Sequence, residues 1–232
     1  NKSTAALNPP GGGINPFSGN FDKAALQHLL RRTLFGASKA DINHFSGKSL
    51  SQVVAELLTV STTPPDPPIK TYTTKQGGVA IDNIDPNVPF GTTWVNTAIS
   101  PTTTPNPDGP RRGVWKGWWM GLMVNQDRNL REKMTLFWHN HLATEADVIN
   151  IAIMIYRHNA LLRQHALGNF KTLMQQVTVD CAMLRYLNGE KNSKTAPDEN
   201  YGREMQELFM VGKGLGSGYT EDDVKAAARV LT

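Results

Sequence analysis

The chain has 232 residues, which is enough for one substantial domain or two small ones with a core that needs no disulfide or metal. Its 24 Lys and Arg residues against 20 Asp and Glu leave a formal net charge of +4, too little for a protein whose affinity comes from phosphates. We therefore expect no nucleic acid partner. The most apolar stretch, residues 148–156, is too short to cross a bilayer, so we also expect no transmembrane segment. The single cysteine, Cys181, has apolar neighbours that predict a buried thiol.

Residues 1–20 are rich in Gly, Pro and Asn and predict a flexible N-terminal arm. Residues 21–60 predict three small helices. Leucines recur at helical spacing between positions 26 and 34, and capping boxes at Ser38 and Ser49 mark the starts of two more helices.

The pattern changes between residues 61 and 110, where ten of the fourteen prolines of the chain occur together with Thr, Asn, Asp and Gly. Prolines at this density exclude a long helix or a central strand. Such a long irregular excursion is either a lid over a site or a variable surface insertion. We favour the insertion, because low-complexity Thr/Pro segments rarely carry chemistry, and we expect it to lie mostly on the surface.

Residues 111–232 form the main helical region. A tryptophan-rich stripe follows Val114, a capping box at Thr144 opens a helix that can run to about Leu167, and the last helix starts at Thr220. The predicted fold is all-α, an irregular multi-helix bundle with a long Pro/Thr-rich surface insertion. The last helix lacks a stop signal, so we expect a truncated C-terminal end. An apolar surface should then be exposed around three residues of that helix, Val224, Ala228 and Leu231.

Six ordered motifs resemble a bacterial family known as domain of unknown function 1800. They are residues 28–36 (HLLRRTLFG), 130–141 (LREKMTLFWHNH), 162–170 (LRQHALGNF), 182–187 (AMLRYL), 199–209 (ENYGREMQELF) and 218–224 (GYTEDDV). The similarity covers about residues 21–59 and 111–232. Asp198 and Leu142 depart from the residues usual in the family at those positions, and neither change removes a strong ligand type.

The resemblance implies an exported protein, periplasmic or secreted, because members of this family are commonly exported. It also implies that the chain continues beyond Thr232, which would make the missing C-terminal portion its first partner. The family has no established activity, so the resemblance implies no reaction.

The most concentrated polar motif is the helix that carries Asn200, Arg203, Glu204 and Glu207. Positions 200, 204 and 207 fall within about 60° of one another on a helix. The carboxylates of Glu204 and Glu207, at the edge of a buried face, could ligate a metal or act as acid and base. The alternative is that Arg203 pairs with Glu199 and Glu207 at four-residue spacing, as on many solvated helices.

His139 and His141 are the second motif. Two residues apart on a helix, their side chains point about 200° apart and cannot share a metal. Both could reach one ion only if the helix ends near Asn140 and leaves the chain extended. Otherwise His141, on the face of Trp138, is a buried histidine hydrogen-bonded to a carboxylate.

These motifs lead to two alternative hypotheses for the function. The first is a metal-dependent hydrolase in which Glu204, Glu207, His141 and His139 hold a divalent metal or share proton transfer, with Glu204, Glu207 and His141 as catalytic groups. The second is a non-catalytic helical binding or assembly module of an extracytoplasmic complex. Both predict that the histidine segment contacts the helix of Asn200, with His141 beside Glu204 or Glu207.

Overall fold

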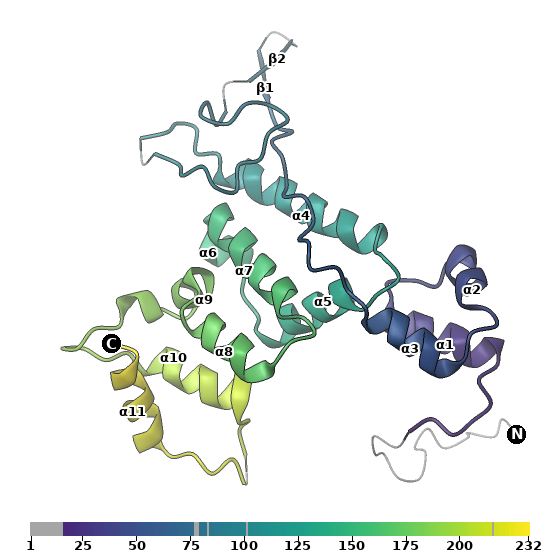
Figure 1. Cartoon of the computed structure of the whole chain (residues 1–232). Helices are drawn as coiled ribbons and strands as arrows, with labels where there is room; N and C mark the ends of the chain where they lie inside the picture. Colours follow the sequence, from purple (N-terminus) through teal and green to yellow (C-terminus); the bar gives the residue numbers. More distant parts are fainter. Residues whose placement is uncertain (1–15, 77–78, 83, 101, 215) are drawn as a thin grey trace, which may run out of the picture.

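The computed structural model describes residues 16–76, 79–82, 84–100, 102–214 and 216–232 (Figure 1). The first half contains α1 Lys23–Thr33, α2 Lys39–Phe45, α3 Leu50–Leu58, β1 Thr74–Gln76, β2 Val79–Ile81, α4 Asp108–Val124, α5 Arg131–His141 and α6 Ala146–Ile149. The second half contains α7 Ala152–Gln164, α8 Phe170–Thr178, α9 Cys181–Tyr186, the 3-10 turn η1 Gly189–Lys191, α10 Glu199–Glu204, the π-helix η2 Met205–Met210 and α11 Glu221–Val230. The expectation of a mostly helical fold is confirmed.

Helices α1, α2 and α3 have a core of their own. Leu26, Leu30 and Leu34 pack against apolar residues of the other two helices. The capping boxes predicted at Ser38 and Ser49 are both formed. This part meets the rest of the chain where the backbone N–H of Leu130 donates to the carbonyl of residue 57 at 2.9 Å.

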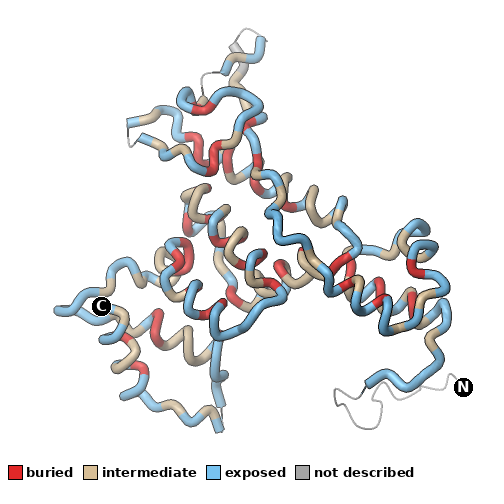
Figure 2. Tube along the Cα trace, in the orientation of Figure 1, coloured by how far each residue is buried: buried red, intermediate tan, exposed pale blue. Residues whose placement is uncertain are grey.

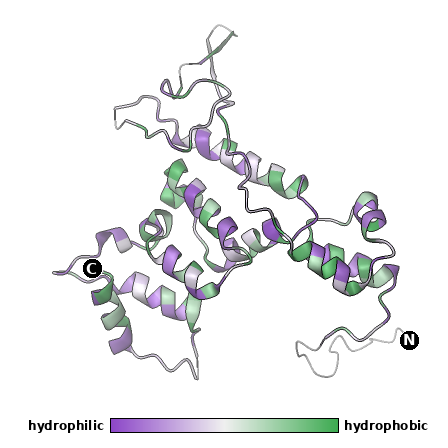
Figure 3. Cartoon of the chain, in the orientation of Figure 1, coloured by the Kyte–Doolittle hydropathy of each residue, from purple (hydrophilic) through white to green (hydrophobic). Residues whose placement is uncertain are grey.

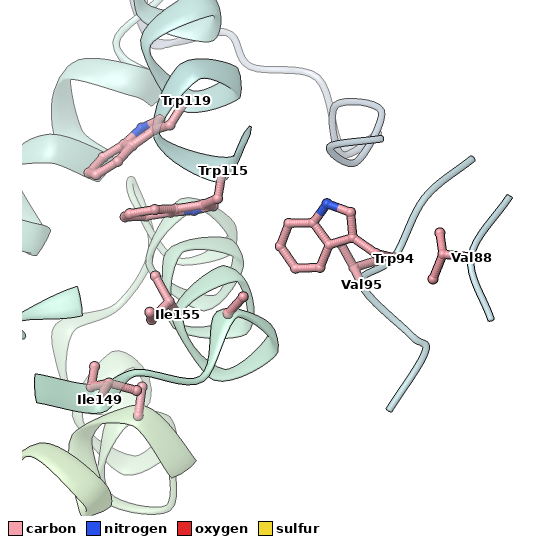
Figure 4. Packing of buried hydrophobic residues seen from close by; sticks show 9 residues of the cluster. Val88, Trp94, Val95, Trp115, Trp119, Ile149 and Ile155 are labelled. Atoms are coloured by element: carbon pink, nitrogen blue, oxygen red, sulfur yellow. The ribbon is translucent and has the colours of Figure 1, made fainter. Parts of the chain in front are cut away.

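The proline-rich segment has little regular structure in its described residues. Its β1 and β2 strands form an antiparallel pair that the sequence pattern did not reveal. Most of its described residues are exposed, as expected, but a few such as Lys70 and Trp94 are fully buried. Figure 2 shows buried stretches of this segment close to α4. Val88 and Trp94 join Trp115 and Trp119 of α4 in one apolar cluster (Figure 4).

Helix α7 is central to this region, because it contacts α4, α5, α6, α8 and α9. Most of these helices carry both polar and apolar positions (Figure 3), and the apolar ones face the shared core. The predicted continuous helix from Thr144 is instead α6 and α7, because Asn150 is left-handed at φ 58° and ends α6. Cys181 at the start of α9 is exposed, so the expected buried thiol is wrong.

Helices α10 and α11 pack closely. A side-chain carbon added at Gly202 would lie 3.2 Å from the Cβ of Ala227 and 3.3 Å from the backbone nitrogen of Ala228. Val224 and Ala228 are fully buried within this chain, so the predicted exposed apolar surface around them is wrong. Among the described residues, no helix is both long and apolar enough to cross a membrane.

Candidate functional site

The two histidines of α5 lie on opposite sides of the helix. Because α5 stays helical through His141, the side chains diverge as the helical period requires. His141 Nε2 lies 2.9 Å from the carbonyl oxygen of Phe209 in η2. The His139 ring lies 4.9 Å from the ring of Trp119 and 6.3 Å from that of His158. The extended backbone on which shared metal binding by both histidines depended is therefore not formed.

His139 is held in its neutral form. Burial, reinforced by the nearby His158 ring, lowers the pKa of His139 to about 4. A charged imidazolium at this position would lose its hydration without gaining an acidic partner.

Glu199 of α10 and Glu207 of η2 belong to a network of ion pairs around Arg203, whereas Glu204 is half-buried and has no ion pair among the described residues. Arg203 pairs with Glu199 at 3.2 Å and with Glu207 at 3.7 Å, which confirms the four-residue pairing considered from the sequence. Both terminal nitrogens of Arg203 also donate to Glu221, at 2.8 and 2.7 Å. The hydroxyl of Tyr219 and the ammonium of Lys213 hold the pKa of Glu207 below its usual range.

The predicted contact between the histidine segment and the helix of Asn200 is present, but with another partner. His141 contacts the Phe209 carbonyl, not Glu204 or Glu207. Asn200 donates its side-chain N–H to the carbonyl of Leu187 at 3.0 Å. No group of three or more His, Cys, Asp or Glu side chains in the described ranges is arranged to hold a metal ion. His139, His141, Glu204 and Glu207 therefore do not form one ligand set, and a catalytic role for His141, Glu204 or Glu207 stays a prediction.

A buried polar layer between α5, α7 and α9 was not predicted from the sequence. Arg163 donates to both carboxylate oxygens of Glu132, at 2.6 and 3.0 Å, and to the side-chain oxygen of Asn159 at 2.8 Å. His158 Nδ1 lies 2.9 Å from a carboxylate oxygen of Asp180. The available signal was the four-residue spacing of Asn159 and Arg163 in α7.

A cavity of about 610 Å³ lies on the outer side of this polar layer. Residues 61–65, which we call the strap, form one of its walls, and we call it the strap cavity. Its other walls come from α4, from the start of α5 and from α7 with the turn that follows. The lining residues used below are Trp118, Arg131, Tyr156 and Arg163.

Arg131 fixes the strap and carries the free positive charge of the cavity. One of its terminal nitrogens donates to the carbonyls of Ser61 at 2.9 Å and Thr63 at 3.3 Å. Its Nε is buried and has no hydrogen-bond partner among the described residues. The charge of Arg163 is already matched by Glu132, whereas no described acid pairs with Arg131. None of the described residues that line the cavity is acidic.

Two aromatic side chains form an apolar wall beside these arginines. The rings of Trp118 and Tyr156 lie 5.7 Å apart, and the guanidinium carbon of Arg163 lies 5.1 Å from the Trp118 ring. The Trp118 indole N–H donates a hydrogen bond to the carbonyl of Asp66 at 2.8 Å. Burial raises the pKa of Tyr156, an effect that the charge of Arg163 opposes, so its hydroxyl remains protonated at neutral pH.

The fold and this geometry define a helix-rich protein with a lateral cavity of aromatic and cationic character. The family model described as "Protein of unknown function (DUF1800)" matches residues 28–232, and the chain belongs to this family. The matched region includes the strap and all the helices that line the cavity. No curated protein and no solved structure matches the chain.

Proposed function

We propose that this chain is a helical ligand-binding protein and that the strap cavity takes a small molecule with an anionic group beside a flat ring. The observation that carries this proposal is the guanidinium of Arg131, which lines the cavity and has no acid among the described residues to balance its charge. A hydrogen bond to a charged group contributes about 1.5–3 kcal/mol. A ligand anion that accepts from the terminal N–H groups of Arg131 would balance this charge.

The remaining features of the cavity support the same ligand class. The Trp118 and Tyr156 rings offer flat apolar surfaces, and aromatic groups gain about 0.5–1.5 kcal/mol from such packing beyond their buried area. The protonated hydroxyl of Tyr156 adds a donor. A volume of about 610 Å³ falls within the range of pockets that enclose small organic molecules.

A metal-dependent hydrolase is the weaker candidate. His141 Nε2 is hydrogen-bonded to the Phe209 carbonyl, and the Glu207 carboxylate forms ion pairs with Arg203 and Lys213. Among the described residues, no group of three or more His, Cys, Asp or Glu side chains is placed to hold a metal ion at either residue.

We also propose that the protein works outside the cytoplasm, as a non-catalytic binding module of an extracytoplasmic complex. This rests on the resemblance of its motifs to an exported family. Fractionation of the cells that produce it, with an antibody against this chain, tests the location. Recovery only with the cytoplasmic fraction would contradict it.

Calorimetric titration with naphthalene-2-sulfonate, an anionic ring compound, tests the ligand class. Naphthalene-2-methanol supplies a ring without charge, and methanesulfonate supplies the charge without a ring. We expect the first compound to bind more tightly than either of the others. Arg131→Gln should weaken the sulfonate by about tenfold or more, because a hydrogen bond to a charged group contributes about 1.5–3 kcal/mol.

The controls separate recognition from folding. Arg157→Gln removes an equal charge from the exposed surface of α7 and should leave the affinity unchanged. Arg131→Gln also loses the hydrogen bonds to the strap, so Tyr156→Leu, which keeps those bonds, provides the second test. Circular dichroism checks that each variant is folded. Equal sulfonate affinity in the wild type and both cavity variants would overturn the proposal.

A further inference from the structure

A second concave surface lies between α1 and α5, away from the strap cavity. Its volume is about 410 Å³, and it shares no lining residue with the strap cavity. We call it the α1–α5 groove. The residues that give it its character are Arg31, Arg32, Lys133, Met134, Phe137 and Asn140.

The groove concentrates positive charge. Arg31 and Arg32 lie in the last turn of α1 and are exposed, and Lys133 projects from α5 beside them. No acidic side chain occurs among the described residues that line the groove. None of these three cations forms an ion pair in the part of the chain that the structure describes. Like charges gathered around a concave, partly apolar surface attract anions more strongly than isolated surface charges do.

The floor of the groove is apolar. Opposite faces of α5 have different roles, because Glu132 and Thr135 are buried towards the interior whereas Lys133, Phe137 and Asn140 follow one another on the outer face. Phe137 is 52% exposed, which is high for so large an apolar side chain. The Lys133 ammonium lies 4.4 Å from the centre of the Phe35 ring, so this cation stays at the edge of the groove.

We propose that the α1–α5 groove docks an acidic polypeptide segment that inserts one apolar side chain against Phe137 and Met134. Carboxylates on either side of that side chain would meet Arg31, Arg32 and Lys133, and the amide of Asn140 would hydrogen-bond the peptide backbone. An arginine fork suits carboxylates, since it can donate two parallel hydrogen bonds. The concave shape favours a peptide over a flat lipid surface. Three cations are also too few for the extended row of phosphate contacts that gives nucleic acid affinity.

Fluorescence anisotropy with two labelled peptides tests this proposal on the full chain. One peptide has the sequence Asp-Glu-Phe-Asp-Glu, and its neutral counterpart is Asn-Gln-Phe-Asn-Gln. We expect the acidic peptide to bind more tightly at low salt and to weaken as salt is added. The double variant Arg31→Gln/Lys133→Gln should weaken the acidic peptide by about tenfold or more.

Two further variants keep the result interpretable. Lys116→Gln and Arg157→Gln remove exposed cations from α4 and α7, and together they form a charge-matched control that should bind like the wild type. Phe137→Ser should weaken both peptides, because it removes the apolar contact and leaves the charges in place. The proposal is overturned if the groove variants bind the acidic peptide like the wild type. It is also overturned if anionic phospholipid vesicles or a duplex oligonucleotide bind through Arg31 and Lys133 while the acidic peptide does not.

Discussion

His139 and His141 lie about half a helical turn apart and occupy two different chemical environments. Both side chains are partly buried, but His141 is hydrogen-bonded to a backbone carbonyl of η2, whereas His139 contacts the rings of Trp119 and His158. The helical period alone predicted their divergence. The contact of His139 with Trp119 depends on where α4 packs, and this cannot be predicted from the spacing of residues in the sequence.

The depressed pKa of His139 predicts that the protein loses stability as the pH falls. An unfolded histidine takes up a proton near pH 6.5, whereas His139 in the folded chain does so only at about pH 4. Between these values the unfolded chain binds more protons, so acid favours unfolding. From about pH 7.5 to about pH 5, the free energy of unfolding should fall by about 2 kcal/mol through this group.

Urea unfolding of the wild type and of His139→Gln at the two pH values measures this contribution. The variant should lose about 2 kcal/mol less than the wild type over the same interval. His28→Gln removes an exposed histidine of α1 and should follow the wild type. Parallel pH dependence in His139→Gln and the wild type would show that His139 does not titrate as described.

The residues of the candidate site were only partly predictable from the sequence. The pairing of Arg203 with Glu199 and Glu207 follows from their spacing, and it is formed. The bond of His141 to the Phe209 carbonyl could not be predicted, because it depends on where η2 lies. Arg131 stood within a recognised motif, yet its role in the strap cavity depends on its hydrogen bond to the distant Ser61, which the motif does not reveal.

Among the helices, local capping signals were reliable and long-range packing was not. The capping boxes at Ser38, Ser49 and Thr220 are formed, because each depends on residues three positions apart. The box expected at Thr144 is not formed, and α6 begins at Ala146 without a side-chain cap. Short α6 is held instead by burial of Ile149 and by the left-handed Asn150.

The close approach of α10 and α11 predicts an unusual response to alanine. In an open helical position such as Gly113, alanine should stabilise the chain by up to about 1 kcal/mol, because it is the better helix former. At Gly202 the added carbon meets the backbone of α11 at 3.3 Å. Gly202→Ala should therefore destabilise the protein by about 1–2 kcal/mol.

Thermal unfolding of Gly202→Ala and Gly113→Ala, followed by circular dichroism, compares the same substitution in the two settings. We expect opposite signs. A melting temperature that rises in both variants would mean that α11 moves away at little cost, and the tight packing of the two helices would not be a constraint.

In the molecule as a whole, the proline-rich segment is attached to the helices by buried polar groups as well as by Trp94. Two nitrogens of Arg111 in α4 each lie 2.7 Å from a carboxylate oxygen of Asp85. The Tyr72 hydroxyl donates to the same carboxylate at 2.6 Å. Burial raises the pKa of Asp85, but Arg111 and Tyr72 more than offset this effect and hold it below its usual range. Composition indicated an irregular segment, but it could not show this anchoring.

Breaking this pair should loosen the segment. Asp85→Asn leaves the guanidinium of Arg111 buried without its charge partner, which costs about 3–5 kcal/mol. Hydrogen exchange should accelerate in residues 66–100 more than in α8 or α10. Asp147→Asn, the same change in an exposed pair with Arg112, should cost less than about 1 kcal/mol. Equal exchange rates in the two variants would contradict the anchoring role.

The proposed function requires the strap cavity to bind an anionic ring compound between Trp118, Tyr156 and Arg131. Intermolecular nuclear Overhauser effects between bound naphthalene-2-sulfonate and the assigned side chains of the protein test it most directly. We predict contacts from the ring protons of the probe to Trp118 and Tyr156, together with a shifted Nε–H resonance of Arg131. Contacts confined to exposed apolar residues elsewhere, such as Phe90, with Trp118, Tyr156 and Arg131 unaffected, would contradict the claim.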